Sequence, residues 1–147
     1  MDISLKLPER LQEIMSKKKM NASDLAKQLD ASTSTISRYL RGERLPSYSS
    51  FIKLLEVLNC SADFLIGLVD EPPAEVRFYA VGAFSDRFER LMKERHMSQY
   101  ALHRITNFSY DNFNKWLKGE TAPYVDNLIK LSQAFNCSVD YLLGRVK

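Results

Sequence analysis

Apolar side chains recur along this chain at the three- and four-residue spacing of helices that bury one face. Leu11, Ile14 and Met15 follow this spacing in the first such segment, which we place from about Glu9 to Lys18. A run of similar segments follows, each opened by a residue that favours a helix start. The pattern therefore predicts a chain built from short amphipathic helices.

Helix-start signals set the boundaries of the next elements. Asn21 can cap a helix that runs to Leu29, with Asp24 as its capping-box partner. Ser32 caps a third helix that ends before Gly42. The predicted helices of the first sixty or so residues are then 9–18, 21–29, 32–41, 49–58 and one that begins at 61.

The same pattern occurs twice. Shifting the sequence by 77 residues aligns Arg10–Gly67 with Arg87–Gly144 without a gap, and about 18 of the 58 pairs are identical. The endings LNCSADFLIG and FNCSVDYLLG are one such match. A gapless match of this length indicates a duplicated domain. The second copy is predicted to hold helices at 86–95, after Ser98, after Ser109 as far as Gly119, at 124–135 and after Ser138.

The duplication also explains the repeated cysteine and aspartate. Cys60 and Cys137 are equivalent positions in two copies, so we expect each to lie buried in its own core, and neither copy has a CxxC motif. Asp63 and Asp140 follow Ser61 and Ser138 at the position of a first helical turn, where a carboxylate suits the helix dipole. We therefore predict no metal site, no cofactor and no catalytic carboxylates.

Composition fits an ordinary globular protein. The chain has 147 residues, of which 45% are hydrophobic and 27% charged, and its net charge is +3. That mild charge permits a nucleic-acid partner without requiring one. The sequence contains no apolar run long enough for a membrane span and no signal peptide. Two cysteines do not make a disulfide framework, so we expect a cytoplasmic protein.

Two short helices joined by a tight turn, within about sixty residues, describe a helix-turn-helix domain. The stretch MNASDLAKQLDASTSTISRYLRGERLPS resembles the core of the phage Cro/repressor-type family, also called the XRE type, and MSQYALHRITNFSYDNFNKWLKGETAPY resembles the same core with more drift. The resemblance implies an all-α chain with two tandem five-helix lambda-repressor-like helix-turn-helix domains, joined by a partly apolar linker.

The resemblance also implies a mechanism, in which the third helix of a domain enters the major groove of double-stranded DNA. Arg38 suits guanine, and Asn114 suits adenine. Asp111 sits awkwardly beside phosphates unless it accepts from cytosine. The predicted base-contacting residues are Thr33, Ser34, Ser37 and Arg38 in the first copy and Tyr110, Asp111, Asn114 and Lys115 in the second.

Phosphate contacts should fix how the domain sits on the duplex. Backbone N–H groups at the starts of the second and third helices can supply some of them, and basic side chains after the third helix can supply others. The predicted phosphate-contacting residues are Ala22, Ser32, Arg41 and Arg44 in the first copy and Gln99, Ser109 and Lys118 in the second.

Two positions depart from the family pattern. Ala22 stands where the family usually has Gln, which removes one expected side-chain contact, whereas the second copy keeps Gln99. His103 stands at a position that is usually a small Ala, as it is at Ala26. We expect this histidine to alter how the second and third helices of its copy pack.

The segment between the copies is too apolar for a free tether. We assign 1–68 to the first domain, 69–85 to the linker and 86–147 to the second domain. Glu71-Pro72-Pro73 should be extended. Alternation at Val76, Phe78 and Ala80 hints at a strand, although 74–81 could equally be helical. We expect this stretch to pack against a domain or to form a subunit contact, and a homodimer stays open.

The sequence as a whole predicts a non-enzymatic, sequence-specific DNA-binding transcriptional regulator, with repression as its expected mode and no evident small-molecule ligand. The alternative is a protein-interaction module, of the antitoxin or antirepressor type or a dimerisation unit, in which the second domain no longer contacts DNA. A purely structural helical adaptor is a third class. Tyr110, Asp111 and His103 favour a role without DNA for the second domain, whereas Arg38, Arg41 and Arg44 favour DNA for the first.

Overall fold

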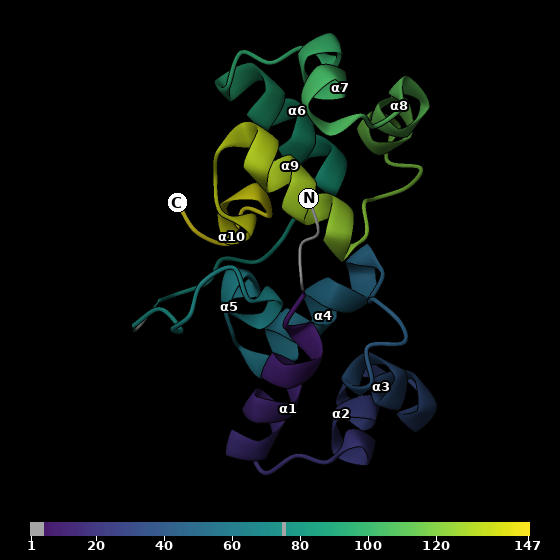
Figure 1. Ribbon diagram of the computed structural model, residues 1–147, viewed down its shortest axis with the longest axis vertical. Helices are drawn as coiled ribbons and strands as arrows, with labels where there is room; N and C mark the ends of the chain where they lie inside the picture. The colour runs from purple at the N-terminus through teal and green to yellow at the C-terminus, as the bar shows by residue number, and fades with distance from the viewer. Residues whose placement is uncertain (1–4, 75) are drawn as a thin grey trace. The chain divides into compact units, whose positions relative to one another are not determined.

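The computed structural model describes residues 5–74 and 76–147, and over these residues the chain folds into ten α-helices and no strand (Figure 1). The helices form two compact units, one ending at Val76 and the other beginning at Arg77. The predicted all-α fold with two tandem five-helix domains is confirmed.

The first unit contains five helices in the predicted order. Pro8 lies in the first turn of α1, where proline is tolerated because its missing N–H would be unbonded there, and this places the helix start two residues before the expected Glu9. The bounds are α1 Leu7–Lys17, α2 Ala22–Leu29, α3 Thr33–Leu40, α4 Tyr48–Leu58 and α5 Ala62–Ile66.

The second unit repeats the order. Its first helix begins at Phe84, so Phe84 and Ser85 are helical and do not belong to the linker to which the sequence assigned them. Phe84 is buried and contacts the rings of Phe88 and Trp116, which explains why the helix extends back to it. The bounds are α6 Phe84–Glu94, α7 Gln99–Thr106, α8 Tyr110–Lys118, α9 Val125–Phe135 and α10 Val139–Leu142.

The predicted helix caps are present. The side chain of Asn21 accepts from the N–H of Asp24 at 2.8 Å, and the carboxylate of Asp24 accepts from the N–H of Asn21 at 3.0 Å, which completes a capping box. Ser32 accepts from Thr35 N–H at 3.1 Å, and Ser109 accepts from Asn112 N–H at the same distance. Each cap satisfies a backbone donor that a helix start leaves unpaired.

The two cores differ in composition. The first is largely aliphatic around Phe51, with Leu11, Leu25 and Ile36 fully buried. The second is an aromatic cluster in which the rings of Phe88, Phe113 and Trp116 lie 5.8–6.1 Å apart at tilted or edge-on angles. Edge-on ring pairs of this kind add to the gain from burial.

The prediction that the two cysteines lie buried in the cores is wrong. Cys60 and Cys137 are half-buried and follow the helix that precedes α5 or α10. Asp63 and Asp140 do lie in the first turns of α5 and α10, as predicted, and both side chains are also buried. The buried carboxylate of Asp140 pairs with Arg145 at 2.7 Å.

The segment before α6 packs against the second unit. Tyr79 N–H donates to the carbonyl of Arg145 at 2.8 Å, and the Arg145 guanidinium lies 4.1 Å from the ring centroid of Phe78. Residues 76–83 form neither the strand nor the helix that the sequence left open. Glu75 in the predicted linker lies outside the described residues. We name the cluster of Phe78, Tyr79, Asp140 and Arg145 the arginine clasp.

Neither a membrane span nor a metal cluster emerges from residues 5–74 and 76–147. The helices there are too short and too polar to cross a bilayer. The same residues bring together no group of three or more His, Cys, Asp or Glu side chains that could hold a metal ion.

Candidate nucleic-acid interface

The third helix of the first unit presents a polar face to solvent. Ile36 and Tyr39 are buried and fix α3 against the core. The positions about half a turn around the helix point the other way, because a helix turns about 100° per residue. Of the four predicted base-contacting residues on this face, Thr33, Ser34 and Arg38 are exposed and Ser37 is half-buried.

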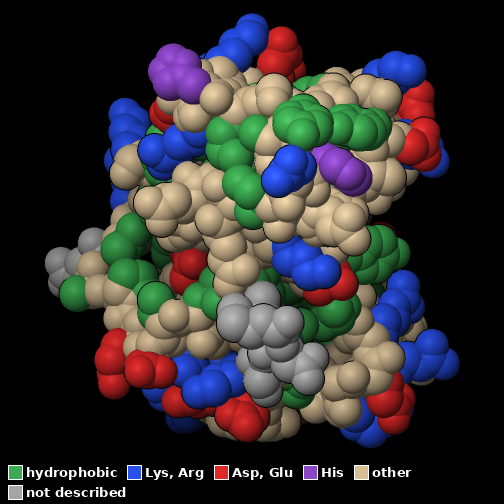
Figure 2. Space-filling view, turned by 45° about the horizontal axis from the view of Figure 1, so that its top comes forward, with side chains coloured by type: hydrophobic (Ala, Val, Ile, Leu, Met, Phe, Trp, Pro, Cys, Tyr) green, Lys and Arg blue, Asp and Glu red, His purple; other side chains and the backbone are tan. Residues whose placement is uncertain are grey.

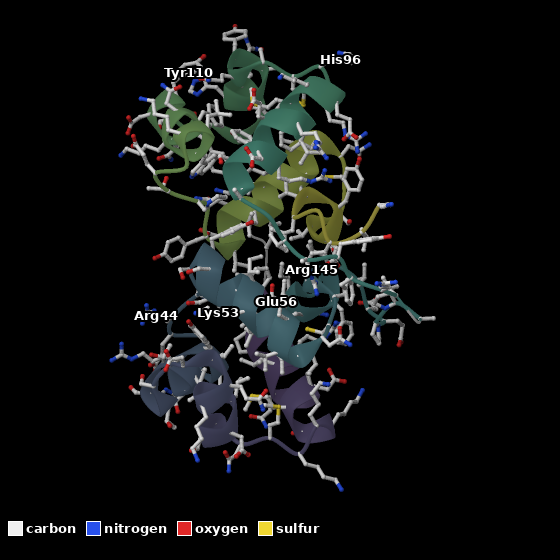
Figure 3. All side chains as sticks on the ribbon, turned by 180° about the vertical axis from the view of Figure 1, so that it is seen from behind. Arg44, Lys53, Glu56, His96, Tyr110 and Arg145 are labelled. Atoms are coloured by element: carbon white, nitrogen blue, oxygen red, sulfur yellow. The ribbon has the colours of Figure 1, made fainter. Side chains whose placement is uncertain are left out.

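Basic side chains flank this helix at its C-terminal end. Arg41 donates two hydrogen bonds to Glu43, at 2.9 and 3.1 Å, so its guanidinium already has a partner. These bonds hold the pKa of the Glu43 carboxyl below its usual value, with a smaller contribution from the charge of Arg38. Arg44 is exposed and points away from the helices of its unit (Figure 3). Arg44 is thus the better placed of the two arginines for a phosphate.

Backbone donors lie at the two helix starts of the motif. Ala22 is the first residue of α2 and is half-buried, and Ser32 is the exposed N-cap of α3. The caps engage the N–H groups of Asp24 and Thr35, at the third position of each helix. The N–H groups of the first two positions have no partner within their own helix, which suits an anion.

The equivalent face of the second unit is more strongly paired within itself. Phe113 and Trp116 are buried and fix α8. Tyr110, Asp111 and Asn114 are exposed and Lys115 is half-buried. Lys115 Nζ lies 3.1 Å from the Asp111 carboxylate.

The neighbouring helix contributes a second contact on this face. Gln99 Nε2 donates to Asn114 Oδ1 at 3.4 Å, from the first turn of α7 to the middle of α8. Gln99 is half-buried, whereas the other predicted phosphate-contacting residues of this unit, Ser109 and Lys118, are exposed. The structure thus adds two contacts among the predicted residues of the second unit, Asp111 with Lys115 and Gln99 with Asn114.

His103 changes the helix-turn-helix packing of the second unit. Its ring stacks on Tyr110 with centroids 4.8 Å apart, and its Nδ1 lies 2.7 Å from the carbonyl oxygen of Phe108. The equivalent Ala26 is a small, buried residue of α2. The larger ring thus fills the junction between α7 and the turn before α8, and it supports Tyr110 at the start of α8.

Large apolar side chains replace polar ones on this part of the second unit. Tyr100 and Ile105 are each 60% exposed and Tyr110 is 42% exposed. The positions 77 residues earlier are Ser23, Gln28 and Thr33. Figure 2 shows hydrophobic side chains gathered beside a histidine in the upper part of the molecule. The two motifs share a fold but present different chemistry.

One of two ion pairs in the candidate interface had a sequence signal that single positions do not reveal. Asp111 and Lys115 are four residues apart on a predicted helix, which is the spacing of helical ion pairs. Arg41 and Glu43 are two apart in a loop, where spacing indicates nothing. The first pair could have been predicted and the second could not.

Comparisons with known proteins match both units. A family model described as helix-turn-helix matches residues 11–65, and one described as a Cro/C1-type helix-turn-helix DNA-binding domain matches residues 87–147. A protein of Haemophilus influenzae named an uncharacterized HTH-type transcriptional regulator is 30% identical over 147 aligned residues. The alignment covers 93% of this chain and 61% of that relative, so the chain spans about three fifths of its length.

One solved structure is also similar. The crystal structure of a transcriptional regulator from Listeria innocua superposes with a TM-score of 0.43 and 21% identity, over 70% of this chain and 88% of that one. The family assignment rests on the two family models and the relative, which agree with the helices and caps described above. The chain therefore belongs to the Cro/C1-type, or XRE-like, helix-turn-helix family and carries two such domains in tandem.

Proposed function

We propose that this chain is a sequence-specific DNA-binding transcriptional regulator that acts as a repressor, with α3 of the first unit inserted in the major groove. The observation that carries the proposal is the exposed polar face of α3, on which Arg38 stands beside three hydroxyl side chains. A guanidinium can donate two bonds to guanine, whereas hydroxyls discriminate weakly among bases. Arg38 is therefore the main specificity residue of the first unit.

The surroundings of α3 support this role. Capped starts of α2 and α3 offer backbone N–H groups to phosphates, and Arg44 offers a charge on the same motif. We assign the chain no catalytic step. Bound to chromosomal DNA it would act in the cytoplasm, where its cysteines would stay reduced.

Binding to duplex DNA should weaken steeply as salt is added, because each neutralised phosphate releases counterions. With about three phosphate contacts, the slope of log K against log salt should be about −3. Titrating the full chain against a pool of genomic fragments at several salt concentrations measures this slope. The Arg44→Ala variant is the matched control and should make the slope shallower by about 1. A complete lack of binding at low salt would contradict the proposed function.

A second candidate function assigns the second unit to contact with protein instead of DNA. Its exposed Tyr100, Ile105 and Tyr110 favour this, since aromatic side chains are enriched at protein interfaces. In this version the first unit alone binds DNA, and the second unit serves as an interaction or dimerisation module.

Footprinting separates the two versions of the second unit. If both units contact DNA, the protected site has two halves of different sequence, because α3 and α8 present different side chains. The double variant Asn114→Ala, Lys115→Ala should then lose protection of one half only. Arg38→Ala is the matched variant in the first unit and should weaken protection of the other half. Unchanged protection in the double variant would assign the second unit to protein contact.

A further inference from the structure

Asp111 and Lys115 form an ion pair on α8. They lie four residues apart, so one helical turn places both side chains on the same stripe. The Lys115 ammonium is 3.1 Å from the Asp111 carboxylate, and the Asp111 side chain is 73% exposed. The pair therefore presents an acceptor and a donor side by side toward solvent, on the face that carries the predicted base contacts.

If α8 lies against DNA, the negative charge of Asp111 needs a hydrogen-bond donor beside it. A carboxylate near the DNA backbone is repelled by phosphates, and it is stabilised there only by a donor within bonding distance. Lys115 supplies that donor in the unbound protein. In a DNA complex the same need is met if the carboxylate faces an amino group of a base while Lys115 stays close.

The major-groove edge of a G·C pair matches this arrangement. Guanine offers two adjacent acceptors, N7 and O6, and cytosine offers the N4 amino donor next to them. An ammonium that donates to N7 and O6, together with a carboxylate that accepts from N4, gives a partner to each acceptor and donor on this edge. Neither charge of the protein is left buried without a partner, which is the costly outcome in a desolvated interface.

An A·T pair fits less well. Its one donor, the adenine N6 amino group, lies between the acceptors N7 and O4, so a carboxylate aimed at it meets an acceptor on each side. The ammonium then finds a single acceptor instead of two. The coupled pair should therefore discriminate by base pair and also by strand, because the donor and acceptor ends of the G·C edge differ.

From these contacts we propose that Asp111 and Lys115 act together to recognise one G·C base pair, with Asp111 accepting from cytosine N4 and Lys115 donating to guanine O6 and N7. The assignment rests on the proposed function, in that it requires the chain to bind DNA. The first unit has Ser34 and Arg38 at the equivalent positions and so has no acidic partner there. The two units should consequently select different base pairs at the position that these equivalent residues contact.

Selection of bound duplexes from a randomised library tests the assignment on the full chain. Wild type should select a G·C pair at one position of the second half-site. Asp111→Asn should reduce that preference on the order of tenfold, the range expected for one good base contact. The charge exchange Asp111→Lys, Lys115→Asp keeps an ion pair on the helix but reverses its direction, so the selected pair should change strand.

The possible outcomes separate a failure of this inference from a failure of the proposed DNA-binding function. If the exchanged variant selects the same base pair as wild type, the ion pair only stabilises α8 and the inference is overturned. If wild type selects an Arg38-dependent half-site and nothing beside it, the inference is also overturned while DNA regulation by the first unit stands. If wild type selects no sequence at all, both fail. Trp116 fluorescence checks that the variants remain folded, because the ring of this α8 residue is buried in the core of the second unit.

Discussion

Replacing Arg145 with Ala should lower the free energy of unfolding of the second unit by about 3–5 kcal/mol, the usual cost of removing one member of a buried ion pair. The Arg145 side chain is buried, bonds to the buried carboxylate of Asp140 at 2.7 Å and lies over the ring of Phe78. Removing the guanidinium deprives Asp140 of this charged partner away from water. It also removes the surface against which Phe78 packs.

Trp116 makes this loss easy to measure. It is the single tryptophan of the chain and lies in the aromatic core of the second unit, so its fluorescence in a denaturant titration follows that unit. Leu68 is the position equivalent to Arg145 in the first unit and is exposed. Leu68→Ala is thus the matched control and should leave the Trp116 transition unchanged. A loss below about 1 kcal/mol for Arg145→Ala, as for an exposed pair, would contradict the proposed role of the clasp.

Replacing Arg38 with Ala should weaken binding to the preferred first half-site by about 1–3 kcal/mol, or roughly 5- to 150-fold in affinity, and relax the choice of one base pair. The reason is the loss of two directional bonds to a base, together with one positive charge. Because Arg38 is exposed, the fold should be unaffected. Competition between the preferred duplex and duplexes changed at single positions measures both effects.

Arg44→Ala is the matched control for this measurement. It removes an equal charge from the same motif but no proposed base contact, so it should weaken all duplexes alike and preserve their ranking. If Arg38→Ala changes affinity without changing the ranking, Arg38 contacts phosphate. In that case a different side of α3 faces the bases.

The fold could be predicted because its determinants are local and occur twice. Apolar spacing gives the helices, and Asn21, Ser32 and Ser109 give their starts, which the hydrogen bonds confirm. The sequence places the starts of α1 and α6 at Glu9 and Asp86, two residues later than the observed Leu7 and Phe84. The difference arises because a helix start also depends on what its first turn packs against. The sequence does not encode such contacts at fixed spacing.

The clasp was missed because one of its contacts joins distant residues. Arg145 pairs with the nearby Asp140, but it also lies over the ring of Phe78, which is far away along the chain. The half-buried position of the cysteines depends on how tightly each core closes around them. In the candidate interface, the pairing of Asp111 with Lys115 and of Arg41 with Glu43 depends on the conformations of exposed side chains, which residue type alone does not determine.

The arginine clasp has a consequence for how the segment before α6 exchanges its amide hydrogens with solvent. Tyr79 N–H donates to the carbonyl of Arg145 at 2.8 Å, and the Arg145 guanidinium lies over the ring of Phe78. An amide hydrogen held in such a bond exchanges only when the local structure opens. Loosening the clasp would therefore speed the exchange of the Tyr79 amide hydrogen without altering any residue that is proposed to touch DNA.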